Sequence, residues 1–558
     1  MSREMTIPSP QVFRTRGWCS VFVPLAAVVL GMLWWGTAAR AETPAAEMLF
    51  PKVTMAFASF PNLTQLKERM LTTNLGRLWT DPALAEFVKS AEEGVKKWLD
   101  NDDPDFGLSL QSALSIPVGE VAIGVLSNGT NRPNVVVVVD VGSHREDLDK
   151  LLEKIELAME RGKSEKKTAE VQGETITSFK QGSQQVSYCI KEQALIVSST
   201  VSGIETVLSN WSGGRDVLGE SENFQLVRHK CESGEAAIFQ YYLDPLALAK
   251  MGLKSNPLQM AIVMATLPST GFDKIKAIGG RLEVGADAFD SIFKSFIVAN
   301  TPAAGLVKVF DLEVRAAKPP TWISDEACEY LVSHNNLSAA YDAIAKFYDS
   351  QMGPGSFGKW VKRNSQNELG IHIKNDVVDH LSGTWHLVGK ANEEHSAMVF
   401  ALELKDEVKA KAVLDRLFDK LKAAVEEHQF EGVAMQEINL GNLVIFSAVS
   451  QQHLLVSGSK ELLESVLRKG ETRTPLPEAP WYRRLISSLP AQACFYWFED
   501  SATTWKPAFA ALRKSGLPVD FEKLPGNDVL TKFLAPTATY ILPDDQGALV
   551  VWFQLKAE

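Results

Sequence analysis

Hydrophobic and polar residues recur along this chain with two different periods, one typical of helices and the other of strands. Asp81-Pro82 supplies a helix N-cap and a first-turn proline, and apolar residues follow at helical spacing: Leu84, Phe87, Val88, Ala91, Val95 and Leu99. The helix predicted at Asp147–Met159 also carries one apolar stripe, formed by Leu148, Leu151, Leu152, Ile155 and Met159. Both helices therefore have one face suited to packing on a core.

Shorter apolar runs predict strands and hairpins. Val118–Val125 and Val135–Val141 flank Asn128-Gly129, which is a strong hairpin signal. Further strands are predicted at Thr54–Phe60, in four runs between Thr168 and Ser199, at Ala236–Leu243, and at Ile278–Glu283 and Phe289–Ala299 around Gly285-Ala286-Asp287. Hairpins outnumber strand–helix–strand crossovers, so we expect an α+β fold with mostly antiparallel sheet and helices packed on one face.

The order of these elements recurs, because residues 51–300 match residues 325–555 loosely in five blocks. The offset between matched residues falls steadily from 274 to 256, as in the pairs Leu63/Leu337 and Gly119/Gly383. A period this long predicts a tandem duplication of one α+β unit, not a solenoid. With Pro319-Pro320 as the boundary, the predicted organisation is a signal peptide at 1–41, a first repeat at 42–318 and a second repeat at 319–558.

The first 41 residues have the pattern of an export signal. Arg14 and Arg16 form a basic region, Val21–Trp35 is apolar, and Ala39-Arg40-Ala41 ends the segment with a small-x-small cleavage pattern before Glu42. We expect cleavage there and a periplasmic or extracellular mature protein. The uncharged stretch from residue 17 to residue 39 is long enough to span a bilayer, so an inner-membrane anchor is the alternative.

Charge limits the class of partner. The chain has 57 basic and 68 acidic residues, a net charge of −11, and removal of residues 1–41 would leave 53 basic and 67 acidic residues, a net charge of −14. This acidic balance argues against non-specific binding to nucleic acid or to anionic lipid. We expect no nucleic-acid partner and no membrane span in the mature chain.

Four cysteines follow the predicted signal, and none is in a Cys-x-x-Cys pair: Cys189, Cys231, Cys328 and Cys494. The repeat offsets place Ala448, Thr54 and Ile238 opposite Cys189, Cys328 and Cys494. These counterparts favour small buried side chains over a disulfide framework shared by both halves, although an exported location permits a bridge within one half.

No phosphate-binding loop, dinucleotide fingerprint, His-Glu-x-x-His or nucleophile elbow occurs in the sequence. One group has the residue types of a metal or acid–base site: His372, Asp376, Asp379, His380 and His386. Its counterparts in the first half are mostly apolar or small: Leu108, Ser112, Ser115, Ile116 and Ala122. A solvated turn followed by a strand is therefore the preferred interpretation, with no catalytic, cofactor or metal residue assigned.

A second group, the acidic loop from Asp100 to Gly107, has the oxygen-rich composition of a calcium site. Its register fails the helix–loop–helix calcium pattern, because Pro104 or Phe106 falls where that pattern needs a ligand or a glycine. We expect a polar loop that closes the preceding helix.

The third group is aromatic and is the one that both halves share. Phe495-Tyr496-Trp497-Phe498 is matched by Phe239-Gln240-Tyr241-Tyr242. Aromatic residues that alternate along a strand can line a groove for carbohydrate or peptide, although such strands more often pack in a core.

Several segments together resemble a family of exported bacterial proteins, abundant in planctomycete-type bacteria, that carry a domain of unknown function. They include PKVTMAFASFPNLTQLKERMLTTNLGRLWTDPALAEF, TGFDKIKAIGGRLEVGADAFDSIF and IKNDVVDHLSGTWHLVG. The resemblance implies export and duplication, and it implies no activity and no catalytic residue. We expect a non-enzymatic envelope protein that binds or scaffolds an envelope protein or polysaccharide, with a periplasmic hydrolase of an unrecognised type as the alternative.

Overall fold

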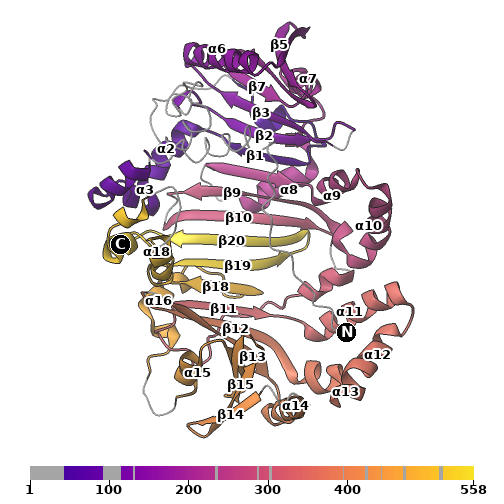
Figure 1. Ribbon diagram of the computed structural model, residues 1–558, viewed down its shortest axis with the longest axis vertical. Helices are drawn as coiled ribbons and strands as arrows, with labels where there is room; N and C mark the ends of the chain where they lie inside the picture. Colours follow the sequence, from indigo (N-terminus) through magenta and orange to yellow (C-terminus); the bar gives the residue numbers. More distant parts are fainter. Residues whose placement is uncertain are drawn as a thin grey trace, which may run out of the picture.

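The computed structural model describes residues 43–91, 93, 115–129, 132–232, 237–285, 288–300, 305–393, 395–420, 425–441, 443–468, 473–513 and 520–558. Twenty strands in these ranges form one sheet, and each described pairing is antiparallel (Figure 1). Helices lie at both ends of the sheet and along its two sides. The expected α+β fold with a mostly antiparallel sheet is confirmed.

The strands of the first half are β1 Ala56–Phe60, β2 Val121–Leu126, β3 Asn134–Asp140, β4 Glu165–Val171, β5 Glu174–Gln181, β6 Gln184–Lys191, β7 Ala194–Ser198, β8 Phe239–Leu243, β9 Ile275–Val284 and β10 Phe289–Ala299. Those of the second half are β11 Glu329–His334, β12 Leu381–Ala391, β13 Ser396–Leu404, β14 Val425–Phe430, β15 Val433–Asn439, β16 Val444–Ser450, β17 His453–Ser457, β18 Phe495–Glu499, β19 Thr537–Asp544 and β20 Gly547–Leu555.

The α-helices are α2 Leu63–Thr72, α3 Asn74–Trp79, α6 Arg145–Arg161, α7 Val201–Asn210, α8 Glu222–Cys231, α9 Pro245–Leu253, α10 Pro257–Thr270, α11 Leu337–Met352, α12 Ser356–Val361, α13 Asn367–Leu369, α14 Glu407–Lys420, α15 Lys460–Leu467, α16 Pro480–Ile486, α17 Ser501–Thr504, α18 Lys506–Arg513 and α19 Asn527–Thr531. Within the described ranges, no helix combines the length and the apolar composition needed to cross a bilayer.

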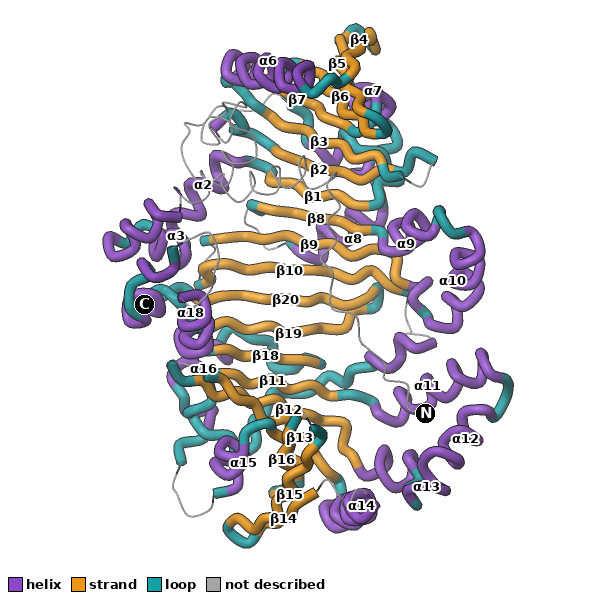
Figure 2. The backbone as a smooth tube through the Cα atoms, in the orientation of Figure 1, coloured by secondary structure: helices purple, strands orange, loops and turns teal. Residues whose placement is uncertain are grey.

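Strand order is the same in the two halves when it is read outward from the centre of the sheet (Figure 2). From the central pair β10–β20, one half runs β10-β9-β8-β1-β2-β3-β7-β6-β5-β4 and the other runs β20-β19-β18-β11-β12-β13-β17-β16-β15-β14. Elements that hold the same position in each order, such as β8 and β18, are called equivalent below. A common origin of the halves stays a prediction that this order supports.

Local sequence explains where the elements begin and end. The β-branched run of β3 suits an extended strand packed between neighbours, and β2 pairs with it as the Asn128-Gly129 signal predicts. In α10, the side chain of Asn256 accepts a hydrogen bond from the N–H of Gln259, and Pro257 occupies the first turn. Gly271 ends α10 with φ 81°, a left-handed conformation in which glycine carries no steric cost.

The two faces of the sheet differ in how they are covered. On one face, called the buried face, α7, α8 and α15 pack over two large apolar clusters that include Phe57, Phe296, Tyr496 and Phe498. Helices therefore cover this face of the central strands, but α2 packs on the opposite face, where Leu63 and Leu66 join Val121 and Val284, so the expectation of helices on one face holds only in part. At the end of the sheet formed by the first half, α6 packs on the opposite face. Its Leu148 and Leu152 form a cluster with Val139 of β3, whereas the next residue along β3, Val138, points into the large cluster on the buried face.

Candidate functional site

The predicted histidine–aspartate group is not assembled as one site. His372, Asp376, Asp379 and His380 lie in the short helical turns η7 Ile373–Val377 and η8 Val378–His380, or directly before them. Asp376 accepts the backbone N–H of His372 at 2.8 Å and lies 3.6 Å from the guanidinium of Arg416. One partner is the backbone of the turn itself and the other is Arg416 on α14, so the turn is a capped structural element that packs beside α14.

His386 lies apart from that turn, on the buried face of β12. Its Nδ1 atom is 3.1 Å from the hydroxyl of Tyr330, and its ring centroid is 5.4 Å from that of His453 on β17. Trp322 packs edge-on against both imidazoles. His334 on β11 lies one step further along, with Nδ1 3.1 Å from the hydroxyl of Thr384. Three buried histidines, His334, His386 and His453, therefore lie close together, and only His386 belonged to the candidate group in the sequence.

Burial sets the protonation state of this histidine cluster. Desolvation, together with the neighbouring His453 and His334, lowers the pKa of His386 to about 3, and desolvation also lowers the pKa of His453 and of His334. Glu403 keeps a lowered pKa despite burial, because its carboxylate accepts hydrogen bonds from Ser382 and Thr384. The imidazoles are thus neutral at pH 7, and they lie packed in the core, where Nε2 of His334 and Nε2 of His453 have no hydrogen-bond partner among the described residues.

The first half holds a buried pair of acids instead. Glu120 accepts the backbone N–H of Ala46 at 2.7 Å, and Asp140 accepts the N–H of Gly142 at 2.9 Å. Desolvation, reinforced by the neighbouring Glu47 and Asp140, raises the pKa of Glu120 to about 7, and desolvation also raises the pKa of Asp140. The sequence analysis missed this pair, although a carboxylate inside or at the end of a valine-rich run was a visible signal.

One described group has ligand atoms close enough for a metal ion. Glu426 and His428 on β14 and Glu437 on β15 place one ligand atom each within 4.8 Å of one another, and His428 Nε2 is 2.9 Å from Glu437 Oε2. The three side chains lie on a partly exposed hairpin. The contact between His428 and Glu437 accounts for their approach without an ion.

The four cysteines are buried and unpaired. Desolvation raises the pKa of Cys189 and Cys231 to about 12 and that of Cys328 and Cys494 to about 11. These thiols are protonated at pH 7 and behave as small core side chains, as the sequence analysis favoured. The candidate calcium loop from Asp100 to Gly107 lies outside the described residues.

The aromatic strands β8 and β18 divide their side chains between the two faces. Tyr242, Tyr496 and Phe498 are buried in the main clusters. Phe239 and Tyr241, and equivalently Phe495 and Trp497, point to the opposite face, which we call the open face. The core interpretation is therefore confirmed for alternate residues of each strand, and a groove lined by the others stays a prediction.

Register shows that the open face continues across the centre of the sheet. Residues directly opposite one another share a face, and the pairs run from Tyr241 on β8 to Gly280, Ser295, Val550, Ile541, Phe495, Ser333 and Trp385 on β12. The other positions of this face are mainly apolar, and they include Phe293, Ile297 and Trp552. Most are partly exposed, and Trp497 is 39% exposed.

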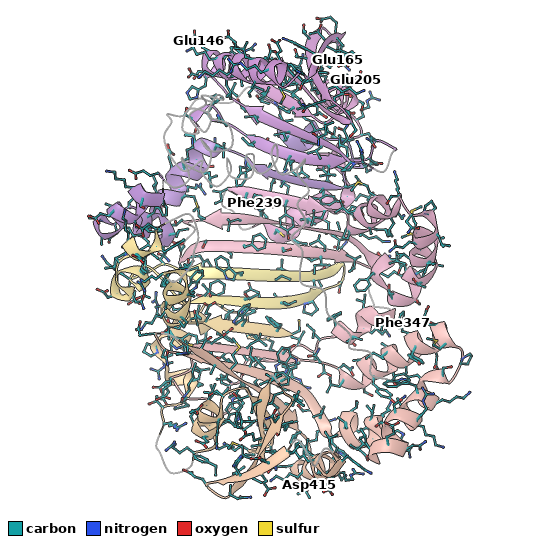
Figure 3. The ribbon with its side chains drawn as sticks, viewed as in Figure 1. Glu146, Glu165, Glu205, Phe239, Phe347 and Asp415 are labelled. Carbon is teal, nitrogen blue, oxygen red and sulfur yellow. The ribbon has the colours of Figure 1, made fainter. Side chains whose placement is uncertain are left out.

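Aromatic rings on the open face are held in fixed positions. Tyr241 stacks on Phe293 with a centroid distance of 5.9 Å, and its hydroxyl lies 2.7 Å from that of Ser295. Gly280 leaves room for the Tyr241 ring, because a Cβ atom there would lie 2.9 Å from it. In Figure 3, Phe239 is labelled among side chains that stand over the central strands.

Comparison with known proteins gives no family. No family model and no curated protein matches this chain. Two solved structures are similar to parts of it: "Structure of crystal form III of TP0453", at 11% identity over 50% of this chain and 90% of that chain, and "Structure of crystal form I of TP0453", at 9% identity over 51% and 90%. Both have a TM-score of 0.23, at which the likeness supports no conclusion about fold or function.

Proposed function

We propose that this chain is an exported envelope protein that acts by binding, and that the open face is its contact surface. The observation that carries the proposal is the equivalent placement of Phe239 and Tyr241 on β8 and of Phe495 and Trp497 on β18. An apolar surface of this extent that the described helices leave partly exposed is typical of an interaction site.

The chemistry of the open face favours a protein partner with an apolar surface over a polysaccharide. Sugar binding needs several hydrogen-bonding groups beside each aromatic ring. On the open face the larger polar side chains, Glu329, Glu499 and Gln554, lie at one end of their strands. The polar residues at the centre are small, such as Ser295, Ser333 and Thr539. Large, rigid aromatic side chains are the residues that dominate protein–protein binding energy.

The proposal is tested by placing a photo-crosslinking amino acid at Trp497 in cells and identifying the crosslinked protein by mass spectrometry. Val408 on α14, which is 78% exposed, is the matched control position. The purified partner is then titrated against the wild type, Trp497→Ala and Val408→Ala. We expect Trp497→Ala to weaken binding by at least about tenfold, the scale of a typical aromatic hot spot, and Val408→Ala to leave it unchanged. Equal crosslinking at both positions, or equal affinities, would contradict the proposal.

A periplasmic hydrolase is the second candidate, and one observation favours it. Desolvation raises the pKa of Glu120 to about 7 beside a second buried acid, Asp140, and carboxyl groups with a strongly perturbed pKa are frequent in acid–base sites. Turnover of a peptide, ester, glycoside or phosphate substrate by the wild type, lost in Glu120→Gln, would support this candidate over binding.

A further inference from the structure

Helices along one side of the sheet expose many large apolar side chains to solvent. We call this region the apolar corner: α9, α10, η4 Phe272–Lys274, η5 Gly305–Phe310, α11, α12 and the following turn η6 Lys362–Gln366. Its large exposed side chains include Leu258 at 73%, Phe310 at 68%, Met352 at 66% and Ile262 at 57%, together with Phe272 and Trp360. No described residue of α9 or α10 is buried.

The composition of α10 makes this exposure unusual. Pro257–Thr270 contains no charged residue and is apolar on every side. A helix of that kind is normally enclosed by protein or by lipid, because water on all sides would leave its apolar surface hydrated. The described part of the chain does not enclose α10.

The apolar corner is continuous. Helix α10 contacts η4, η5 and α11, and α11 contacts η5 and α12. The amide of Gln351 on α11 also lies 3.3 Å from the hydroxyl of Ser269 on α10. These elements project together beyond the same ends of the central strands (Figure 1), and Phe347 marks α11 among them in Figure 3.

Charge in the apolar corner is opposite to that of the whole chain. Seven residues of these elements are basic (Lys250, Lys274, Lys308, Lys346, Lys359, Lys362 and Arg363) and three are acidic (Asp273, Asp342 and Asp349), a local net charge of +4 against −11 overall. The acids are engaged within the protein: Asp342 pairs with Lys374, Asp273 with Lys274, and Asp349 accepts the N–H groups of Gly355 and Phe357. The apolar corner therefore presents apolar and cationic groups together.

We infer that the apolar corner docks on the surface of an anionic lipid bilayer. Such a surface supplies both an apolar layer for Leu258, Ile262 and Phe310 and negative headgroups for the exposed lysines. Trp360 beside Lys359, Lys362 and Arg363 is the residue combination that anchors proteins at headgroup level. A corner-to-corner contact between two copies would place like charges together, so a second copy fits this surface less well.

This docking departs from one expectation that rested on the overall charge. The acidic balance of the chain argued against binding to anionic lipid, but the charge is unevenly distributed, and local charge governs contact with a surface within about one Debye length. The open face and the apolar corner are separate surfaces, so either proposal can fail without the other.

The test is flotation of the full chain with vesicles of phosphatidylcholine alone and of an equal mixture of phosphatidylcholine and phosphatidylglycerol. The proteins are the wild type, the double variant Leu258→Asp/Ile262→Asp and the control Val408→Asp, which is also on an exposed helix. All three carry the same residues 1–42, so any attachment through that segment is common to them. We expect the double variant to bind the anionic vesicles at least about tenfold more weakly than the wild type, since burying one aliphatic side chain accounts for such a factor. Val408→Asp should bind like the wild type, and added salt should weaken wild-type binding.

A second measurement reports on the apolar corner itself, so it remains decisive even where residues 1–42 attach every variant to the vesicles. An environment-sensitive fluorophore on Ile262→Cys should shift to an apolar signal with anionic vesicles, and the same fluorophore on Val408→Cys should not. Equal signals at the two positions would overturn the inference. So would a change in oligomeric state of Leu258→Asp/Ile262→Asp without a change in vesicle binding, because this would assign the apolar corner to a second copy.

Discussion

The two halves of the sheet have the same strand order, yet the helices that follow equivalent strands differ in burial. After β18, α18 and α19 pack Phe509 and Leu530 against Leu78 and Leu84 of the first half, in what we call the packed corner. After β8, α9 and α10 bury no residue. The fold therefore does not require exposed helices at this position, and the exposure of α9 and α10 is a property of the first half alone.

Inner positions of the halves differ as well. Glu120 directly precedes β2, and Asp140 ends β3. In the equivalent strands β12 and β13 the matching residues are Thr384 and Glu403, with His386 and His453 nearby. One half buries an acid pair and the other buries imidazoles. Equivalent strands thus support opposite responses to pH.

The largest expected effect is a difference in stability between substitutions in the packed corner and in the apolar corner. Phe509→Ala removes a buried ring and should lower the free energy of unfolding by about 3–5 kcal/mol, whereas Leu258→Ala at an exposed position should change it by less than about 0.5 kcal/mol. Urea unfolding followed by circular dichroism measures both. Similar losses for the two variants would show that α10 is packed, and would contradict the difference in burial between the two corners.

Acid should destabilise the second half through its histidines. The pKa of His386 is lower in the folded state than in the unfolded state, so the unfolded chain binds more protons below about pH 6.5. Stability is then complete above about pH 6.5 and is lost as pH falls toward 3, with about 1–3 kcal/mol lost by pH 5. His386→Ala should be less stable at pH 7, because Tyr330 loses its partner, but it should show a shallower loss between pH 7 and pH 5.

His428→Ala is the control for that series, since His428 lies on a partly exposed hairpin and has no part in the buried cluster. An unchanged slope in His386→Ala, or an equal change in His428→Ala, would contradict the assignment. Because His386 is buried against Tyr330, its replacement should cost stability even though its counterpart in the first half is Ala122.

The first half should respond to base. The pKa of Glu120 is raised to about 7, so the folded state holds a proton that the unfolded state releases above its own pKa of about 4.5. Its contribution to stability is complete below about pH 4.5 and is lost as pH rises through 7. Glu120→Gln should therefore be more stable than the wild type at pH 8 by about 1–2 kcal/mol and about equal to it at pH 5. Urea unfolding at the two pH values is the measurement, and an equal difference at both would refute the explanation.

Sequence predicted much of the fold, since strands with β-branched residues and turn signals depend on local chemistry. Val135–Val141 appears as β3 Asn134–Asp140, Phe289–Ala299 as β10, and Asp147–Met159 within α6 Arg145–Arg161. The histidine cluster was not predicted, because His334, His386 and His453 come from strands that only the tertiary fold brings together. The exposure of α10 was not predictable either, since an apolar helix is ordinarily buried and composition alone does not show what covers it.

Hydrogen–deuterium exchange of the full chain, with and without phosphatidylglycerol-containing vesicles, tests most directly whether the apolar corner is a contact surface. Lipid contact should slow amide exchange in Pro245–Leu253, Pro257–Thr270 and Gly305–Phe310, because these segments leave water. Exchange in the equivalent packed-corner helices, Lys506–Arg513 and Asn527–Thr531, should stay the same. Unchanged exchange in Pro257–Thr270, or equal slowing in both corners, would contradict the account.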